Sequence, residues 1–379
     1  MRPVLSPRPF HPASPMPVSP RSGGPGAPRV SLSRQAVPLL GLVVLLTTAC
    51  AGDGTASSTS VTSPSTTTGP LTTQPGTTEQ SIEPTTTNIP STPPAAVTET
   101  RTLTHDGLDR SYRLHVPEGL PAGESVPLVL GFHGGLGWAD QFAFSSNYDE
   151  IADRESFIVV YPTGVPVVAG RPAATWNGGY CCGPSARDDI DDVGFVAAVL
   201  DELEAEYPID ANQVFVVGHS NGGIISYRLA CEMSDRIAAI GVVAGSLGGI
   251  DCKPLAAVSI IHIHGDEDHN HPIEGGVGED SVAGVDFNSA AETLDTWIGL
   301  NACDSEPVEH SERSESGDEV QTSTWSGCVG DTEIEFVVIV GGSHAWPGST
   351  SSREGPGGVP SQALDASETI WAFLATHAR

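Results

Sequence analysis

Six short apolar runs that alternate with amphipathic segments constrain the fold of this chain more than any other feature. The apolar runs cover 126–134, 157–162, 213–219, 237–245, 258–265 and 333–342, and the helical patterns cover 141–154, 190–206, 222–233, 287–300 and 361–377. Because the runs carry Val and Ile on both faces, they predict buried strands of a mostly parallel α/β sheet with helices on both faces. Residues 101–117 predict an N-terminal antiparallel hairpin that turns at Asp106-Gly107. In such a sheet the active site lies beyond the carboxyl ends of the strands.

The first fifty residues have a different pattern, which predicts an export signal. Residues 1–35 contain five arginines and no acidic residue, and the apolar run AVPLLGLVVLL (36–46) leads to TTAC, which ends at Cys50. The apolar run is too short for a membrane span, which needs about 20 residues. LTTAC resembles the lipobox of bacterial lipoproteins, although Thr47 stands where Leu is usual. Residues 1–50 are therefore expected to be a lipoprotein signal with Cys50 as the lipidated residue, and an ordinary secretory signal is the alternative.

Residues 51–98 consist mainly of Thr, Ser and Pro and contain almost no large apolar residue. Such a segment buries too little surface to offset its ordering entropy, so we expect a disordered tether. Residues 99–379 remain for one folded catalytic domain. The formal net charge of −30 excludes nucleic acid as a partner and leaves membrane contact to the lipid anchor alone.

The pentapeptide Gly218-His219-Ser220-Asn221-Gly222 is a G-x-S-x-G motif. An apolar strand precedes it and a helix follows it, which is the context in which this motif forms a nucleophile elbow. The sharp strand-to-helix turn lifts the serine to the top of the sheet, and the helix directs its positive N-terminal end at developing negative charge. Ser220 is therefore the candidate nucleophile.

A serine nucleophile needs a base, an acid that orients the base, and two donors for the oxyanion. In this fold the acid and then the histidine follow the serine along the chain, and His344, on a glycine-flanked loop after the last strand, has the best position for the base. Asp266 and Asp268 both follow an earlier strand and are both candidates for the acid. The backbone amide of Asn221 supplies one oxyanion donor. The other is expected in the loop after 129–135, around Gly135 and Leu136.

With these motifs the chain resembles a known family, the exported esterases grouped with polyhydroxybutyrate depolymerases, feruloyl esterases and acetylxylan esterases. The resemblance covers nearly all of 99–379 and rests on DGLDRSYRLHVP, FHGG, YPTG, WNGGYCCG with DDVGF, GHSNGG, HGDED and GGSHAWPG, in that order. It implies an α/β-hydrolase fold, ester hydrolysis without a cofactor, and Asp268 as the acid, with Asp266 as the alternative. The histidines at 269 and 271 are not expected from the family pattern.

Two clusters of polar residues raise the question of a metal. His262 and His264 share one face of a strand, and His269 and His271 follow Asp268 in the next loop, so a zinc site is conceivable. However, His264 belongs to the family-like HG turn and no second cluster completes a site. The aspartates of 188–192 suggest calcium, but acids in the first turn of a helix are favoured by its dipole. We therefore expect no metal.

Export predicts that the six cysteines after Cys50 form disulfides. Six cysteines allow fifteen pairings, and the resemblance suggests Cys231–Cys252 and Cys303–Cys328, which leaves Cys181 and Cys182 to bond each other. Pairing of these two neighbours with distant cysteines is the alternative.

The resulting hypothesis is an exported serine carboxylic-ester hydrolase, lipid-anchored at the outer face of the cell membrane or secreted, that acts as a monomer. Hydroxybutyrate oligomers and feruloyl or acetyl esters of polysaccharides are the expected substrates. Trp176 and Trp346, on loops near the same end of the sheet, are candidates to stack against the substrate. A serine peptidase on the same fold and a catalytically silent envelope binding protein are the alternatives.

Overall fold

The computed structural model describes residues 94–350 and 357–379. The chain divides into two units, Met1–Ser81 and Ile82–Arg379, and all described residues belong to the second. The expected signal over 1–50, the lipidation site Cys50 and most of the expected tether over 51–98 lie outside the described residues. The first strand begins at Val97, two residues before the expected start of the folded domain.

A ten-stranded sheet forms the centre of the second unit, with the strand order β1-β2-β4-β3-β7-β8-β9-β12-β11-β10. The strands are β1 (Val97–His105), β2 (Leu108–Val116), β3 (Val126–Phe132), β4 (Ile158–Pro162), β7 (Ile209–His219), β8 (Ala239–Val243), β9 (Ser259–Gly265), β10 (Val308–Arg313), β11 (Glu319–Trp325) and β12 (Ile334–Ile339). The six strands from β4 to β12 pair in parallel, and antiparallel strands flank them at both ends. The predictions of a mostly parallel sheet and of an N-terminal hairpin are confirmed.

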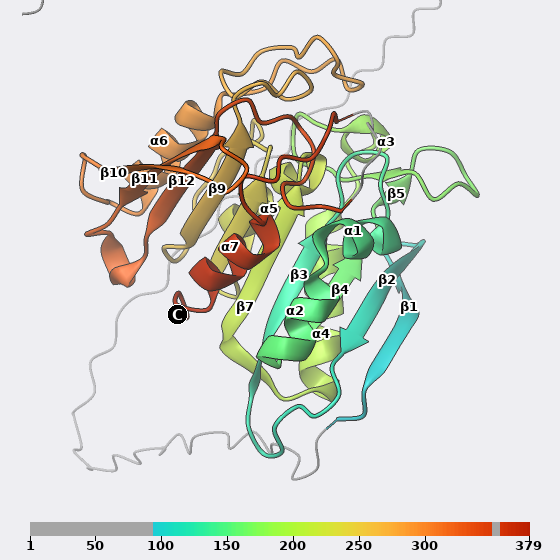
Figure 1. Cartoon of the computed structure of the whole chain (residues 1–379). Coiled ribbons are helices and arrows are strands. Elements are labelled where there is room, and N and C mark those ends of the chain that lie inside the picture. The colour runs from blue at the N-terminus through green and yellow to red at the C-terminus, as the bar shows by residue number, and fades with distance from the viewer. Residues whose placement is uncertain (1–93, 351–356) are drawn as a thin grey trace, which may run out of the picture. The chain divides into compact units, whose positions relative to one another are not determined.

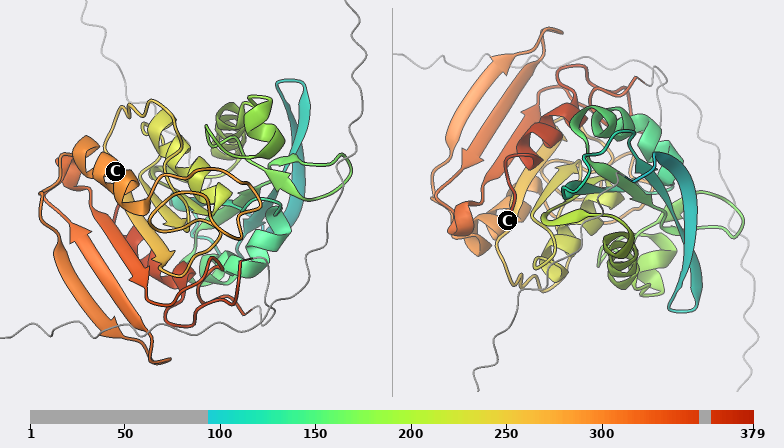
Figure 2. Two further views of the ribbon diagram at one scale, coloured as in Figure 1. Left: turned by 90° about the horizontal axis from the view of Figure 1, so that it is seen from above. Right: turned by 90° about the horizontal axis from the view of Figure 1, so that it is seen from below.

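Helices cover both faces of this sheet (Figures 1 and 2). The helices are α1 (Ala139–Ser146), α2 (Tyr148–Glu155), α3 (Gly183–Arg187), α4 (Asp192–Glu206), α5 (Asn221–Glu232), α6 (Ala290–Leu300) and α7 (Ala366–Leu374), with a short 3-10 turn η1 (Val329–Asp331). Apolar side chains of α4, α5 and α6 share one buried cluster with alternate strand residues such as Leu128 and Leu130. Val129 points the other way and joins the cluster formed by α1, α2 and α7. The period of two along each strand therefore produces two cores, one on each face of the sheet.

Two local features differ from the expectation. The helix expected over 141–154 is divided into α1 and α2 at Asn147, which has a left-handed backbone with φ 56° and ends the first helix. The polar segment between α6 and β12 forms the hairpin β10–β11, although the apolar pattern predicts no strand there. Every residue of β10 is exposed, so this edge strand lacks the buried face on which a periodicity argument depends.

A two-stranded hairpin, β5 (Val165–Pro166) and β6 (Ala174–Thr175), follows β4. It is linked to the loop after β3 by a bridge between Gly137 and Ala174. Over residues 94–350 and 357–379, none of the helices combines the length and the hydropathy that crossing a bilayer requires.

Candidate active site

Ser220 lies on the sharp turn between β7 and α5. Its backbone has φ 55° and ψ −119°, a left-handed conformation that strains a residue with a side chain. Two glycines make the turn possible, because a Cβ at Gly218 would lie 2.1 Å from the Gly222 carbonyl oxygen and one at Gly222 would lie 2.1 Å from that of Phe132. The Ser220 amide donates to the Val243 carbonyl at 2.9 Å. The turn is thus held between β3 and β8, at the carboxyl edge of the parallel strands.

Ser220, His344 and Asp268 form one hydrogen-bonded series. The Ser220 Oγ lies 2.9 Å from His344 Nε2, and His344 Nδ1 lies 2.6 Å from Asp268 Oδ2. The three residues come from the turn after β7, the loop after β12 and the loop after β9. Because β7, β9 and β12 are parallel, their following loops meet at one edge of the sheet. In this arrangement Nδ1–H donates to the carboxylate, and Nε2 is free to accept the serine proton.

Asp268 is buried, with an exposure of 3%. Its Oδ1 accepts the backbone amides of Asn270 and His271, each at 2.8 Å. Burial alone would raise the pKa of Asp268, but the hydrogen bonds of His264 and His344 and the charge of His344 hold it well below its usual range. The carboxyl group is therefore ionised at neutral pH.

The structure separates the two candidate aspartates. Asp266 is exposed, and its Oδ1 accepts the Gly341 amide at 2.5 Å, while Asp268 is the one that faces His344. Both aspartates thus contact the loop after β12, Asp266 at the Gly341 backbone and Asp268 at the His344 ring.

His219, inside the motif, also contacts the candidate base His344. Its Nε2 donates to the His344 carbonyl at 2.7 Å, and its ring lies 5.0 Å from that of His344. Burial, together with the charge of His344, lowers the pKa of His219 to about 4. A neutral His219 thus fixes the loop that carries His344. Its place directly before the serine is the signal from which this contact could have been found.

The oxyanion donors expected from the sequence are only partly available. Asn221 is the first residue of α5, where helix geometry leaves the amide without an intrahelical acceptor. The Gly135 amide has no hydrogen-bond partner among the described residues, and a Cβ at Gly135 would lie 3.7 Å from that of Asn221. Leu136 does not fit the expectation, because its amide donates to the Ala174 carbonyl at 2.8 Å. Of the expected oxyanion donors, the amides of Gly135 and Asn221 therefore remain candidates.

The prediction that Trp176 stacks against the substrate is wrong, because its side chain is completely buried. Its Nε1–H donates to the His133 carbonyl at 3.1 Å. Its backbone exchanges two hydrogen bonds with the Asn221 side chain, from Trp176 N to Oδ1 at 2.8 Å and from Nδ2 to Trp176 O at 3.1 Å. Trp176 therefore joins the loop after β3 to the first residue of α5, the two segments that carry Gly135 and Asn221.

His133 holds the first of these segments from within. It is fully buried, and its Nε2 accepts the Gly164 amide at 3.0 Å while its Nδ1 donates to the Gly134 carbonyl at 2.8 Å. Burial lowers the pKa of His133 to about 4. The neutral ring thus fixes the conformation of the FHGG loop through these two hydrogen bonds.

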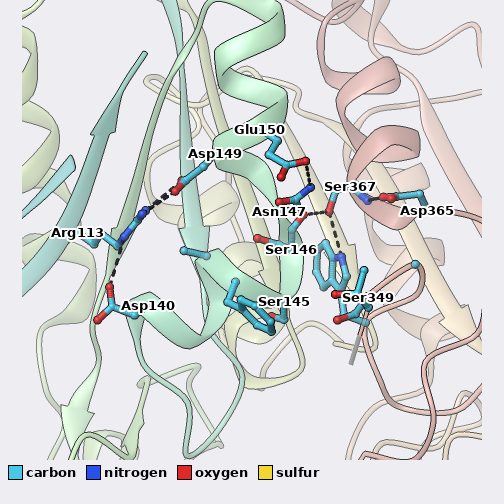
Figure 3. Close-up of a pocket in the computed structure, with 15 residues that line it drawn as sticks. Arg113, Asp140, Ser145, Ser146, Asn147, Asp149, Glu150, Ser349, Asp365 and Ser367 are labelled. Atoms are coloured by element: carbon cyan, nitrogen blue, oxygen red, sulfur yellow. Dashed lines mark hydrogen bonds and ion pairs between the residues drawn. The ribbon is translucent and has the colours of Figure 1, made fainter. Parts of the chain in front are cut away.

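The prediction for Trp346 is wrong for the same reason, since only 4% of it is exposed. Its ring packs edge-on against His219 and Phe142, and its Nε1 donates to the Ser367 hydroxyl at 3.1 Å. Trp346 also lines a cavity of about 610 Å³ beside α1 and α2, whose walls carry four acidic side chains and Arg113 (Figure 3). Ser220, Asp268 and His344 do not line this cavity.

The structure joins the cysteines in the pairs that the resemblance implies. Cys231–Cys252 links α5 to the segment before β9, and Cys303–Cys328 closes the β10–β11 region. Cys181 and Cys182 bond each other and pack with Ile224 and Phe287.

The acidic run at 188–192 has protein partners rather than a metal arrangement. Asp191 caps α4 by accepting the Gly194 amide at 2.9 Å. Asp192 forms a buried ion pair with Arg110 at 2.6 Å and accepts the Asn177 amide at 2.7 Å. In the described part of the chain, no group of three or more His, Cys, Asp or Glu is arranged to hold a metal ion.

A serine on a strained strand-to-helix turn, an imidazole and a buried carboxylate on a mostly parallel sheet define an α/β-hydrolase. The sequence relatives are esterases, which makes the class a serine carboxylic ester hydrolase. A family model narrows this further. The chain belongs to the family described as Esterase PHB depolymerase, whose model matches residues 110–304.

The individual relatives carry esterase names. The chain is 29% identical over 294 residues to "Putative esterase NocK" of Nocardia uniformis subsp. tsuyamanensis, which covers 74% of this chain and 83% of that protein. It is 27% identical to feruloyl esterase B of Piromyces equi, over 62% of this chain and 42% of that protein. Among solved structures, the acetyl xylan esterase from Aspergillus awamori matches with a TM-score of 0.48 and 16% identity, over 65% of this chain and 94% of that one.

Proposed function

We propose that the enzyme hydrolyses carboxylic esters through a covalent acyl-enzyme on Ser220, with His344 as general base and Asp268 as the residue that orients it. The observation that carries this proposal is the pair of distances, 2.9 Å from Ser220 Oγ to His344 Nε2 and 2.6 Å from His344 Nδ1 to Asp268 Oδ2. Both lie within the reach that proton transfer requires.

The proposed reaction has two halves. The Ser220 oxygen bonds to the ester carbonyl carbon while its proton passes to His344 Nε2, and the amides of Gly135 and Asn221 stabilise the oxyanion. The bond to the alcohol oxygen then breaks, and the proton on His344 goes to the departing alcohol. In the second half water gives its proton to His344 and attacks the acyl carbon, and the bond to Ser220 breaks as the proton returns to its oxygen.

The proposed substrates are hydroxybutyrate oligomers and feruloyl or acetyl esters of plant polysaccharides. The relatives named as feruloyl esterases support the second group, and the family name supports the first. The side chains of Leu136 and Trp138, 45% and 36% exposed, offer apolar surface next to Gly135. An apolar acyl group could be held there while its carbonyl oxygen faces the oxyanion donors.

We further propose that the protein is exported and carries a lipid on Cys50, with 51–98 as a tether and 99–379 as a monomeric catalytic domain. The three disulfides support an oxidising compartment. Globomycin treatment of producing cells tests the anchor, because it should leave the signal of a lipoprotein uncleaved.

The decisive experiment combines labelling with hydrolysis. The wild-type protein should react with a fluorophosphonate probe and cleave short p-nitrophenyl esters, and Ser220→Ala should lose both properties. A panel of feruloyl, acetyl-xylan and hydroxybutyrate substrates then ranks the acyl groups. If wild-type protein neither takes up the probe nor cleaves any ester of the panel, the proposal is wrong.

A further inference from the structure

A series of buried polar side chains runs from the catalytic carboxylate into the core. The Tyr227 hydroxyl lies 2.7 Å from His262 Nδ1, and His262 Nε2 lies 3.0 Å from His264 Nδ1. His264 Nε2 lies 2.8 Å from the His271 carbonyl oxygen and 3.3 Å from Asp268 Oδ2. Tyr227, His262 and His264 are each no more than 1% exposed. The proposed reaction uses none of these three side chains directly.

The phenol at the far end determines the direction of the hydrogen bonds. Within the described residues, His262 Nδ1 is the one hydrogen-bond partner of the Tyr227 hydroxyl. If His262 Nδ1 carried a proton, the phenol oxygen would be the acceptor and its own O–H would be buried without a partner, which is costly. The phenol therefore donates to His262 Nδ1. Burial keeps this phenol protonated, since it raises the pKa of Tyr227 far above its usual value.

The donor at Tyr227 then determines the direction of the hydrogen bonds at both imidazoles. A histidine that accepts at Nδ1 is neutral and carries its proton on Nε2, so His262 donates from Nε2 to His264 Nδ1. His264 is then neutral as well, and its Nε2–H faces the His271 carbonyl and Asp268 Oδ2. Burial also lowers the pKa of His262 and of His271 well below the usual value, so both rings stay neutral at pH 7.

His264 and His344 thus share one oxygen of the catalytic carboxylate. Other titratable groups near Asp268 are His219 at the end of β7 and His271 in the loop after β9. The ring of His271 is engaged elsewhere, because its Nε2 lies 2.9 Å from the Ser246 hydroxyl. Over the ranges that the structure describes, His264 is therefore the one ring besides His344 whose nitrogen approaches Asp268 Oδ2.

We propose that His264 is a positioning residue for Asp268, held as a neutral Nε2–H donor by the series from Tyr227 through His262. This inference rests on the proposed role of Asp268 in catalysis. The Nε2–H keeps the buried carboxylate ionised and fixes Oδ2 in front of His344 Nδ1. It also takes up part of the charge on Oδ2, which weakens the attraction of the carboxylate for a protonated His344 and so eases the return of the proton to the leaving alcohol.

Substitution of His264 tests the donor. In His264→Leu the carboxylate loses one donor, so its charge holds the imidazolium more strongly. We expect kcat to fall at least tenfold and the acidic limb of the kcat/KM profile to move to higher pH by roughly 0.5–1 unit. His264→Gln keeps an N–H donor near the position of Nε2, so we expect most of kcat and the wild-type limb to be retained. Unchanged profiles in both variants, or equal losses in both, would overturn the inference.

A second pair of variants tests the Tyr227 end of the hydrogen-bonded series and leaves His264 in place. Tyr227→Phe removes only the hydroxyl that sets the direction, so the acidic limb should move the same way by a smaller amount. Tyr112→Phe is the matched control, because Tyr112 is equally buried and its hydroxyl bonds Glu202 at 2.6 Å instead of a member of the histidine series. Its profile should be that of wild type. If the two variants lose stability alike and neither profile moves, Tyr227 is merely structural and the inference fails.

The protonation states can be observed directly. In ¹⁵N-labelled protein at pH 7, His262 and His264 should both give the signals of neutral rings protonated at Nε2, and Tyr227→Phe should disturb both. A His264 signal from a charged ring, or from an Nδ1–H tautomer, contradicts the proposed direction. Failure of this inference is distinct from failure of the proposed function. If wild-type enzyme is active and Ser220→Ala is inactive, the proposed reaction stands even when the proposed role of His264 is refuted.

Discussion

Replacement of Asp268 by asparagine should abolish most activity without disturbing the fold. One oxygen of the carboxylate accepts two backbone amides at 2.8 Å, and the other faces His344 Nδ1 at 2.6 Å and His264 Nε2 at 3.3 Å. An asparagine keeps its oxygen toward the two backbone donors, since an NH₂ group there would meet N–H groups. Its NH₂ then faces His344, whose Nδ1 has to become an acceptor. The proton of the neutral ring moves to Nε2, where it blocks transfer from Ser220.

The expected loss in kcat is about 10⁴-fold, the size found when this change is made in a serine hydrolase triad, which corresponds to roughly 5.5 kcal/mol of transition-state stabilisation. KM should change little, because the carboxylate does not contact the substrate. Steady-state hydrolysis of p-nitrophenyl acetate measures both parameters. Asp266→Asn is the matched control, because that side chain is exposed and accepts the Gly341 amide rather than contacting His344. A loss below tenfold in Asp268→Asn, or an equal loss in Asp266→Asn, would refute the assignment of the acid.

Three further outcomes follow from contacts of buried groups. Trp176→Phe removes the donor to the His133 carbonyl, so kcat should fall about tenfold at unchanged KM. The free energy of unfolding should fall by ~1 kcal/mol or more. An unchanged kcat in parallel assays would show that the oxyanion loop does not need this bond. The double change Cys181→Ser and Cys182→Ser removes a disulfide between neighbours that closes no long loop. The Tm of thermal unfolding should therefore change little, while kcat/KM decreases. A large loss of Tm with intact activity in the folded fraction would contradict this. The pKa of His133 is lowered from 6.5 to about 4, so between these values the unfolded chain binds the extra proton and the folded chain does not. The free energy of unfolding should therefore fall by up to ~3 kcal/mol as the pH drops from 6.5 to 4, as urea denaturation can measure, and His133→Gln should flatten this dependence.

The apolar pattern predicted the strands that carry the site because those strands are buried on both faces. It could not predict β10, which has no buried face, or the break at Asn147, which depends on one residue in a left-handed conformation. The position of Ser220 could also be predicted, because a motif between a strand and a helix specifies its own local geometry.

Other features of the site depend on long-range contacts that no local pattern records. Trp176 and Trp346 lie on loops, where exposure is the usual expectation, but each is drawn inward by a hydrogen bond to a distant segment. The amide of Leu136 is taken by Ala174 of a hairpin that the apolar pattern does not reveal. The spacing of Asp266 and Asp268 alone could not decide between them, because both follow the same strand.

The polar hairpin at the end of the sheet affects how two copies of the chain meet edge to edge. A long sheet offers unpaired N–H and C=O groups at its outermost strands, and these can pair with the same strand of another copy. The outermost strand here, β10, has the sequence VEHSER, with three of its six residues charged and all of them in solvent. Bringing two such edges together would oppose like charges and strip water from them. The hairpin thus disfavours strand pairing between two copies at this edge of the sheet, independently of the catalytic centre.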